Sequence, residues 1–361
     1  MIKSQVTFKL LLANSKPLVL RPFISGPASA AFHTGRALGY QKEIHEQWTK
    51  TLSDTKPADD DSSLNAKIDE NRFVVTWEHP QATLQQLHQV SVAHHQPKNL
   101  SDRIASRVLL LIRSSFDLFT GYHHPPKGKE NDPNFQMSER KWLERFVFLE
   151  SIAGVPGMVG GMVRHLHSLR LMRRDKAWIE TLLEEAYNER MHLLIFMKLS
   201  KPGIFMRLML LGAQGVFFNL FFISYLLFPR ICHRFVGYLE EEAIVTYTRC
   251  IEDIEAGRLS DWNTRKAPQI AIDYYHMPPE NQTMLDLIYY VRADEAKHRE
   301  VNHTFGNLDQ KRDRNPYALK IIDDKGTPQP SADLSAPKPT GWERNEIAAW
   351  KKPFVFQLVS N

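Results

Sequence analysis

The sequence predicts an all-α fold, built on a four-helix bundle to which two membrane-associating helices are added. Two Glu-x-x-His pairs, Glu189 with His192 and Glu295 with His298, each lie in a stretch with the periodicity of a long helix. The i, i+3 spacing puts a carboxylate and an imidazole on one helix face, one turn apart. Between residues 101 and 305 no stretch stands out with the two-residue period of a strand. We therefore expect helices to form the whole central domain.

A helical stretch with a candidate carboxylate precedes each pair. Glu150 precedes the first pair, and one of Glu240, Glu241 and Glu242 precedes the second. The order Glu, Glu-x-x-His, Glu, Glu-x-x-His is typical of ferritin-like four-helix bundles with a carboxylate-bridged di-iron centre. Four carboxylates balance most of the charge of two divalent irons, and two imidazoles leave positions open for oxygen. The pattern predicts two non-haem iron ions and oxygen chemistry.

A third Glu-x-x-His pair, Glu300 with His303, shows how easily the motif arises without a metal. Glu300 comes five residues after Glu295, which turns it roughly 140° around a helix of ~3.6 residues per turn. We expect this pair to face away from the metal centre.

Six helical stretches are expected in chain order. The first, about 101–121, contains an apolar run over Val108–Ile112 with arginines on either side. The second, about 138–173, carries Glu150 and a glycine-rich stretch over 154–161, which predicts a kink or a close helix contact. The third spans about 176–199, and the fourth, about 203–228, is nearly all apolar. The fifth starts near Pro229, a favourable first-turn residue, and the sixth starts near Pro279.

The fourth stretch meets the length criterion for a transmembrane helix, because Leu208–Phe228 contains no charge. A single crossing of the bilayer there would place the two halves of the ligand set on opposite sides of the membrane. A helix that lies in one leaflet removes the conflict, and the first helix can lie beside it. We therefore predict a monotopic protein in contact with membrane lipid.

The two ends of the chain differ in composition from this helical domain, 101–305. The first forty residues contain Lys and Arg but no Asp or Glu, which predicts a mitochondrial transit peptide over 1–40. Residues 41–100 are polar and predict an extended N-terminal arm, whereas 306–361 are rich in proline and charge and predict a loosely ordered C-terminal tail. The chain has two cysteines, Cys232 and Cys250, too few for a disulfide framework.

Four stretches resemble the signature blocks of the mitochondrial alternative oxidases: Leu149–Ser151, Asn188–Leu193, Leu239–Ala243 and Arg292–His298. The similarity runs from about Arg103 to Phe305, and the 123–129 loop is similar to that of the fungal branch. It implies a cyanide-insensitive ubiquinol oxidase in which two ubiquinols reduce O2 to water without proton pumping. It also implies a homodimer on the matrix face of the mitochondrial inner membrane.

The same resemblance assigns roles to individual residues. It selects Glu240 among the three adjacent glutamates and makes Tyr247 a redox-active residue. The implied iron ligands are Glu150, Glu189, His192, Glu240, Glu295 and His298. The implied quinol-binding residues are Arg113, Asp117, Arg145, Leu149, Glu242 and Thr246. Asn188, His233 and Asp294 are implied to orient the ligands.

Two other classes of function fit the residue pattern. A di-iron hydroxylase that acts on a quinone precursor or a lipid would use the same centre. A non-catalytic, ferritin-like iron-binding membrane protein would take up metal without turnover. Nucleic acid is not an expected partner, because the basic residues have no aromatic-basic recognition motif beside them.

Overall fold

The structure, a computed structural model, describes residues 79–122, 125, 128–129, 132, 135–259, 261–318 and 329–349. The chain divides into two units, Met1–Ile68 and Asp69–Asn361, and all of the described residues belong to the second. The predicted transit peptide lies outside the described residues, as do residues 41–78 of the arm, part of the 123–129 loop, and residues 319–328 and 350–361 of the predicted tail.

The described part of the chain is all-α, as predicted, and it contains one isolated β-bridge, between Lys266 and Thr283, but no strand. The six long helices are α4 (Leu100–Thr120), α5 (Glu139–Leu171), α6 (Trp178–Leu199), α7 (Ile204–Leu227), α8 (Pro229–Glu255) and α10 (Met284–Asn307). The short helices are α3 (Leu84–His88), α9 (Gln269–Tyr275) and α11 (Arg344–Ala349).

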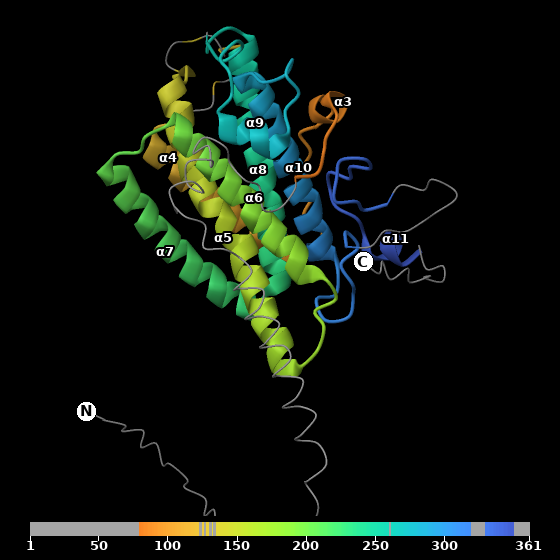
Figure 1. The fold of residues 1–361 in the computed structure, drawn as a ribbon. Helices are drawn as coiled ribbons and strands as arrows, with labels where there is room; N and C mark the ends of the chain where they lie inside the picture. The colour runs from red at the N-terminus through yellow and green to blue at the C-terminus, as the bar shows by residue number, and fades with distance from the viewer. Residues whose placement is uncertain are drawn as a thin grey trace, which may run out of the picture. The chain divides into compact units, whose positions relative to one another are not determined.

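Helices α5, α6, α8 and α10 form the four-helix bundle (Figure 1). Helix α5 packs chiefly on α6, and α8 packs chiefly on α10. Helix α4 lies against α8, and α7 lies against α5. The two added helices are therefore attached to one side of the bundle.

Side-chain caps set the helix ends. Asn99 accepts a hydrogen bond from the backbone N–H of Asp102 at the start of α4. Thr283 and Asp286 form a capping box at the start of α10. The sixth helix therefore begins at Met284 and not near Pro279, because the capping box fixes the first turn.

The glycine-rich stretch brings α5 close to α6. A Cβ on Gly157 would lie 2.6 Å from the backbone oxygen of Leu182, and one on Gly161 would lie 2.8 Å from Leu183 Cδ2. Pro156 sits inside α5, which continues through it as one helix. The close helix contact expected from the glycines is present, and it brings Glu150 on α5 toward the ligands on α6.

Both ends of the described chain pack on the bundle. In the N-terminal arm, Leu87 of α3 is buried and α3 contacts α10. In the C-terminal segment (residues 306–318 and 329–349), Tyr317 and Trp342 are buried beside Trp178 and Phe305. The expectation of a loosely ordered tail is wrong for these residues, because their aromatic side chains join the core.

Two described helices, α5 and α7, are long and apolar enough to cross a membrane. Half of the apolar window of α5 is buried inside the bundle, whereas 11% of that of α7 is buried. Helices α4 and α7 together expose a large apolar surface. The exposed apolar residues of the two helices are Leu100, Ile104, Val108, Leu110, Leu111, Ile112, Leu118, Ile204, Phe205, Leu208, Leu211, Val216, Leu220, Ile223, Leu226 and Leu227.

Candidate metal centre

Four helices bring six carboxylate and imidazole side chains together in the middle of the bundle. They are Glu150 from α5, Glu189 and His192 from α6, Glu240 from α8, and Glu295 and His298 from α10. They form two overlapping groups, in each of which the candidate ligand atoms lie within 4.8 Å of one another. Both groups include Glu189 and Glu295, which is the arrangement that two bridging carboxylates between two metal ions would need.

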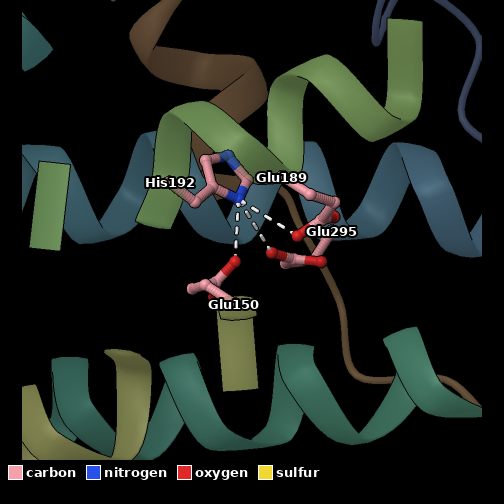
Figure 2. A group of neighbouring side chains, drawn as sticks. All are labelled: Glu150, Glu189, His192 and Glu295. Carbon is pink, nitrogen blue, oxygen red and sulfur yellow. Dashed lines mark ion pairs between the residues drawn. The ribbon is translucent and has the colours of Figure 1, made fainter. Parts of the chain in front are cut away.

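The first group surrounds Nδ1 of His192 (Figure 2). This nitrogen lies 3.4 Å from Oε2 of Glu150 and 3.3 Å from Oε1 of Glu295. In the second group, Nδ1 of His298 lies 2.6 Å from Oε1 of Glu189 and 3.7 Å from Oε2 of Glu295. Each histidine therefore presents one ring nitrogen to a set of carboxylate oxygens.

The electrostatics of the six residues favour bound cations. All six side chains are buried, at 0–7% exposure. Burial, with the neighbouring Glu189, raises the pKa of Glu150 well above its ordinary value, and burial with Glu295 does the same for the pKa of Glu240. Apart from the ion pairs between the histidines and the carboxylates, both oxygens of Glu189 and of Glu295, Oε2 of Glu150 and the Nδ1 atoms of both histidines form no hydrogen bond with the described residues. Buried polar atoms left in this state are costly, and divalent metal ions would satisfy them.

The three adjacent glutamates of α8 have different partners. Glu240 joins the second metal-ligand group. Glu241 accepts hydrogen bonds from His303, at 2.8 Å, and His94, at 2.6 Å. Glu242 pairs with Arg113. Of the three, the structure therefore brings only Glu240 to the other candidate ligands.

Asp294 contacts Nε2 of His192, the ring nitrogen that points away from the other candidate ligands. Its Oδ2 lies 3.0 Å from Nε2 of His192 and accepts hydrogen bonds from Asn188, at 2.9 Å, and Tyr275, at 2.9 Å. Its Oδ1 lies 2.7 Å from Nε2 of His79. Burial would raise the pKa of Asp294, but His79 and His192 hold it well below its ordinary value. Asp294 is thus a charged acceptor that directs Nδ1 of His192 toward the carboxylates.

His79 and Tyr275 are functional candidates that the sequence analysis missed. His79 comes from the N-terminal arm and is 215 positions from Asp294 in sequence. A lone histidine in a polar stretch carries no pattern that points to such a distant partner. Tyr275 lies in a short helix, α9, whose orientation no motif specified.

His233 was expected to orient the ligands, but its hydrogen bonds go to none of the six. Its Nε2 lies 2.9 Å from the hydroxyl of Tyr225, and its Nδ1 lies 3.1 Å from Oδ1 of Asn302. Asn302 in turn donates to the backbone oxygen of His298 and to the carboxylate of Glu185. Burial raises the pKa of Glu185 to about 7, against the opposing effect of His298.

Tyr247 is completely buried beside the first group. Its hydroxyl donates a hydrogen bond to Oε1 of Glu150, and its ring stacks on Phe146 with centroids 4.8 Å apart. Burial and the Glu150 carboxylate raise the pKa of Tyr247 well above its ordinary value. The phenol therefore stays protonated and in contact with a candidate ligand.

Five of the six residues expected to bind quinol form a connected network between α4, α5 and α8. Arg113 donates to Asp117 at 2.8 Å and pairs with Glu242, while Arg145 donates to Asp117 at 2.7 Å. Thr246 donates to the backbone oxygen of Glu242. Leu149 is half-buried on α5, next to Glu150 in sequence.

A cavity of about 580 Å³ reaches the metal centre from another direction, and Asn188, Asp294 and His298 form part of its wall. Other lining residues come from the N-terminal arm, α6, α10 and the C-terminal segment.

Comparison with known proteins gives a consistent family match. The alternative oxidase family model matches residues 82–307. The "Alternative oxidase, mitochondrial" of Aspergillus niger is 62% identical over 271 residues, which cover 75% of this chain and 77% of the relative. That of Yarrowia lipolytica is 58% identical over 301 residues, 82% of this chain and 84% of the relative. That of Ajellomyces capsulatus is 60% identical over 277 residues, 76% and 78% of the two chains.

Proposed function

The chain belongs to the alternative oxidase family of di-iron carboxylate oxidoreductases, and we propose that it is a cyanide-insensitive ubiquinol oxidase. Two ubiquinols would reduce one O2 to two waters, so that the four hydrogens of the quinols balance those of the water. The sharing of Glu189 and Glu295 between two buried ligand groups is the observation that carries the proposal. A mononuclear site formed by the first group would need neither Glu240 nor the second histidine, His298.

The six side chains of the centre would hold two iron ions. Glu150, Glu189 and His192 would bind one ion with Glu295, and Glu240 and His298 would complete the second. When bound, the irons would accept electrons from quinol and pass them to oxygen. The orphaned carboxylate oxygens and Nδ1 atoms support this assignment. Asp294 would keep His192 in the tautomer that leaves Nδ1 free for a metal.

Tyr247 would act on the oxygen side of the reaction. Its hydroxyl contacts Glu150, and burial keeps the proton on the phenol until an electron leaves with it. We propose that Tyr247 supplies an electron and a proton and recovers both from the second quinol. Its stacked aromatic neighbours hold the ring in place and exclude water.

The quinol would dock beside α4 and α5, where Arg113, Asp117 and Arg145 meet. The guanidinium groups would bind the quinol oxygens, and the Glu242 carboxylate would accept a quinol proton. Leu149 and Thr246 complete the proposed set of six quinol-binding residues. Glu242 lies two residues after Glu240, so the proton acceptor and a metal ligand share one turn of α8.

The exposed apolar surface of α4 and α7 would rest in one membrane leaflet. In that position the quinol network would lie next to lipid, the source of ubiquinol. The relatives are named mitochondrial, and we propose that this chain resides on the matrix face of the inner membrane as a homodimer. We further propose that residues 1–40 are removed as a transit peptide. Residues 41–100 would then form the N-terminal arm, 101–305 the oxidase domain and 306–361 the C-terminal tail.

Oxygen uptake by purified, detergent-solubilised protein tests the proposal directly. With a short-chain ubiquinol and cyanide present, the wild-type protein is expected to consume oxygen, and Glu189→Ala is expected not to, because that change removes a shared ligand. Glu144→Ala, which removes an exposed carboxylate on α5, is the matched control and should retain uptake. An iron-loaded wild-type sample that consumes no oxygen with quinol would contradict the oxidase function.

A further inference from the structure

The cavity beside the metal centre lies between parts of the chain that are distant in sequence. Its walls come from the N-terminal arm (His79–Ala82), from α6, from α10 and from the C-terminal segment (Ala332–Leu334). Figure 1 shows α3 and the C-terminal segment on the opposite side of the bundle from α7. The cavity therefore opens away from the apolar surface proposed to meet lipid.

The inner end of the cavity is made of groups that suit a metal ion. His298, one of the six proposed ligands, forms part of the wall. Asn188, also in the wall, is 92% buried, and its Oδ1 has no hydrogen bond to any residue that the structure describes. An amide oxygen of this kind is a hard donor that can replace a water of a hydrated divalent cation.

Among the charged residues of the cavity wall, acidic side chains outnumber basic ones. Glu180, Glu184 and Glu185 line it from α6, and Asp333 lines it from the C-terminal segment. The basic residue Lys297 is 3.2 Å from Glu300, which offsets its charge. A cavity with this balance of charge concentrates cations and repels anions.

Glu185 links the outer part of the cavity to the centre. It precedes Glu189 by four residues on α6, so the two carboxylates lie on one helix face. Glu185 is 5% exposed and accepts hydrogen bonds, at 2.8 and 3.0 Å, from Asn302, which also donates to the backbone oxygen of His298. It belongs to neither ligand group. A buried carboxylate on the path to a metal centre, but outside it, has the position of a transfer ligand.

We propose that this cavity is the route by which ferrous ions enter the metal centre, with Glu185 as the carboxylate that passes each ion inward. The inference rests on the proposed di-iron function. The six ligands are buried, and on the α4 and α7 side a hydrated ion would have to cross apolar side chains at great cost. The acidic cavity instead supplies oxygen donors along the way, so the ion can exchange its waters one at a time.

The test measures metal uptake in the absence of quinol and oxygen. The full chain is stripped of metal in detergent and mixed with Co2+ in a stopped-flow instrument, and the visible absorbance of the bound ion reports loading. Glu185→Gln keeps an oxygen for Asn302 but removes the charge. It is expected to load about tenfold more slowly than wild type, which is within the range of electrostatic steering. Its final Co2+ content should equal that of wild type.

Two further variants make the result decisive. Ala332→Trp narrows the cavity at an exposed position of the C-terminal segment and is also expected to slow loading. Glu252→Gln removes an exposed carboxylate of α8 away from the cavity and should load like wild type.

Wild-type loading rates in both Glu185→Gln and Ala332→Trp would overturn the route. A lower final Co2+ content in Glu185→Gln would also overturn the proposal, because Glu185 would then be a permanent ligand. Failure of the wild-type chain to bind any metal would instead contradict the di-iron function.

Discussion

The hydroxyl of Tyr247 donates a hydrogen bond to Oε1 of Glu150, so a buried phenol directly contacts a carboxylate of the metal centre. Tyr247→Phe should retain the stacking on Phe146 and the bound iron but lower the rate of quinol-driven oxygen uptake. We expect a loss of about 100-fold, the lower end of the effect of a positioned proton donor. Oxygen electrode traces with iron content measured on the same samples check this. Tyr238→Phe is the matched control, because the Tyr238 hydroxyl is buried without a hydrogen bond to the described residues. Equal rates in Tyr247→Phe and wild type would refute the role of the phenol.

Asp294 is expected to control how tightly iron is held, although it is not itself a ligand. Asp294→Asn removes the charge opposite Nε2 of His192. Iron affinity should fall by about 10- to 100-fold, the usual effect of losing such a partner. His79→Ala removes one of the groups that contact Asp294 and should weaken iron binding less. Competition with a chelator measures the iron affinity of both variants. An unchanged affinity in Asp294→Asn would contradict the role of Asp294.

Asp117 is expected to affect quinol binding without affecting iron. It accepts from both Arg113 and Arg145, so Asp117→Asn should let the two guanidinium groups move apart. The KM for ubiquinol should rise about tenfold, which corresponds to the loss of about 1.5 kcal/mol from a charged hydrogen bond. Steady-state kinetics at several quinol concentrations separate KM from kcat. Arg140→Gln, at an exposed pair with Glu144, is the control. A change in iron content with KM unaltered would contradict the assignment.

In acid, the two parts of the C-terminal segment, residues 306–318 and 329–349, should lose the contact between Asp313 and Arg344. Burial would raise the pKa of Asp313, but hydrogen bonds from Arg344, at 2.6 and 3.0 Å, and from the backbone of Asp309 hold it below its ordinary value of 3.8. A lowered carboxylate pKa contributes stability above the ordinary value, and this stability is lost as the pH falls through the folded-state value. Hydrogen exchange at residues 342–349 should therefore rise below about pH 4 relative to α10. Asp313→Asn should show the fast exchange already at neutral pH. An exchange rate that does not depend on Asp313 would disprove the link.

Most of the candidate metal ligands could be predicted from the sequence, because helical spacing alone groups Glu189 with His192 and Glu295 with His298. Spacing could not separate Glu240 from its two neighbours. That choice depends on the rotation of α8 against α4 and α10, which gives Glu241 to His303 and Glu242 to Arg113.

Contacts between segments that are distant in the chain could not be predicted from the sequence. The contact of His79 with Asp294 joins an irregular arm to α10, and no local pattern encodes it. The family resemblance implied that His233 orients the ligands, but its ring nitrogens lie beside Tyr225 and Asn302. The tail was judged by its proline and charge content, whereas its packing depends on two aromatic residues, Tyr317 and Trp342.

The ratio of quinol oxidised to oxygen consumed tests the central claim most directly. Purified protein with two irons per chain is given limiting O2 and excess short-chain ubiquinol in cyanide, and quinone is measured by its absorbance. We expect two quinones for each O2, with all of the oxygen recovered as water. One oxidised donor per O2, with an oxygen atom incorporated into an organic product, would identify a hydroxylase and contradict the account.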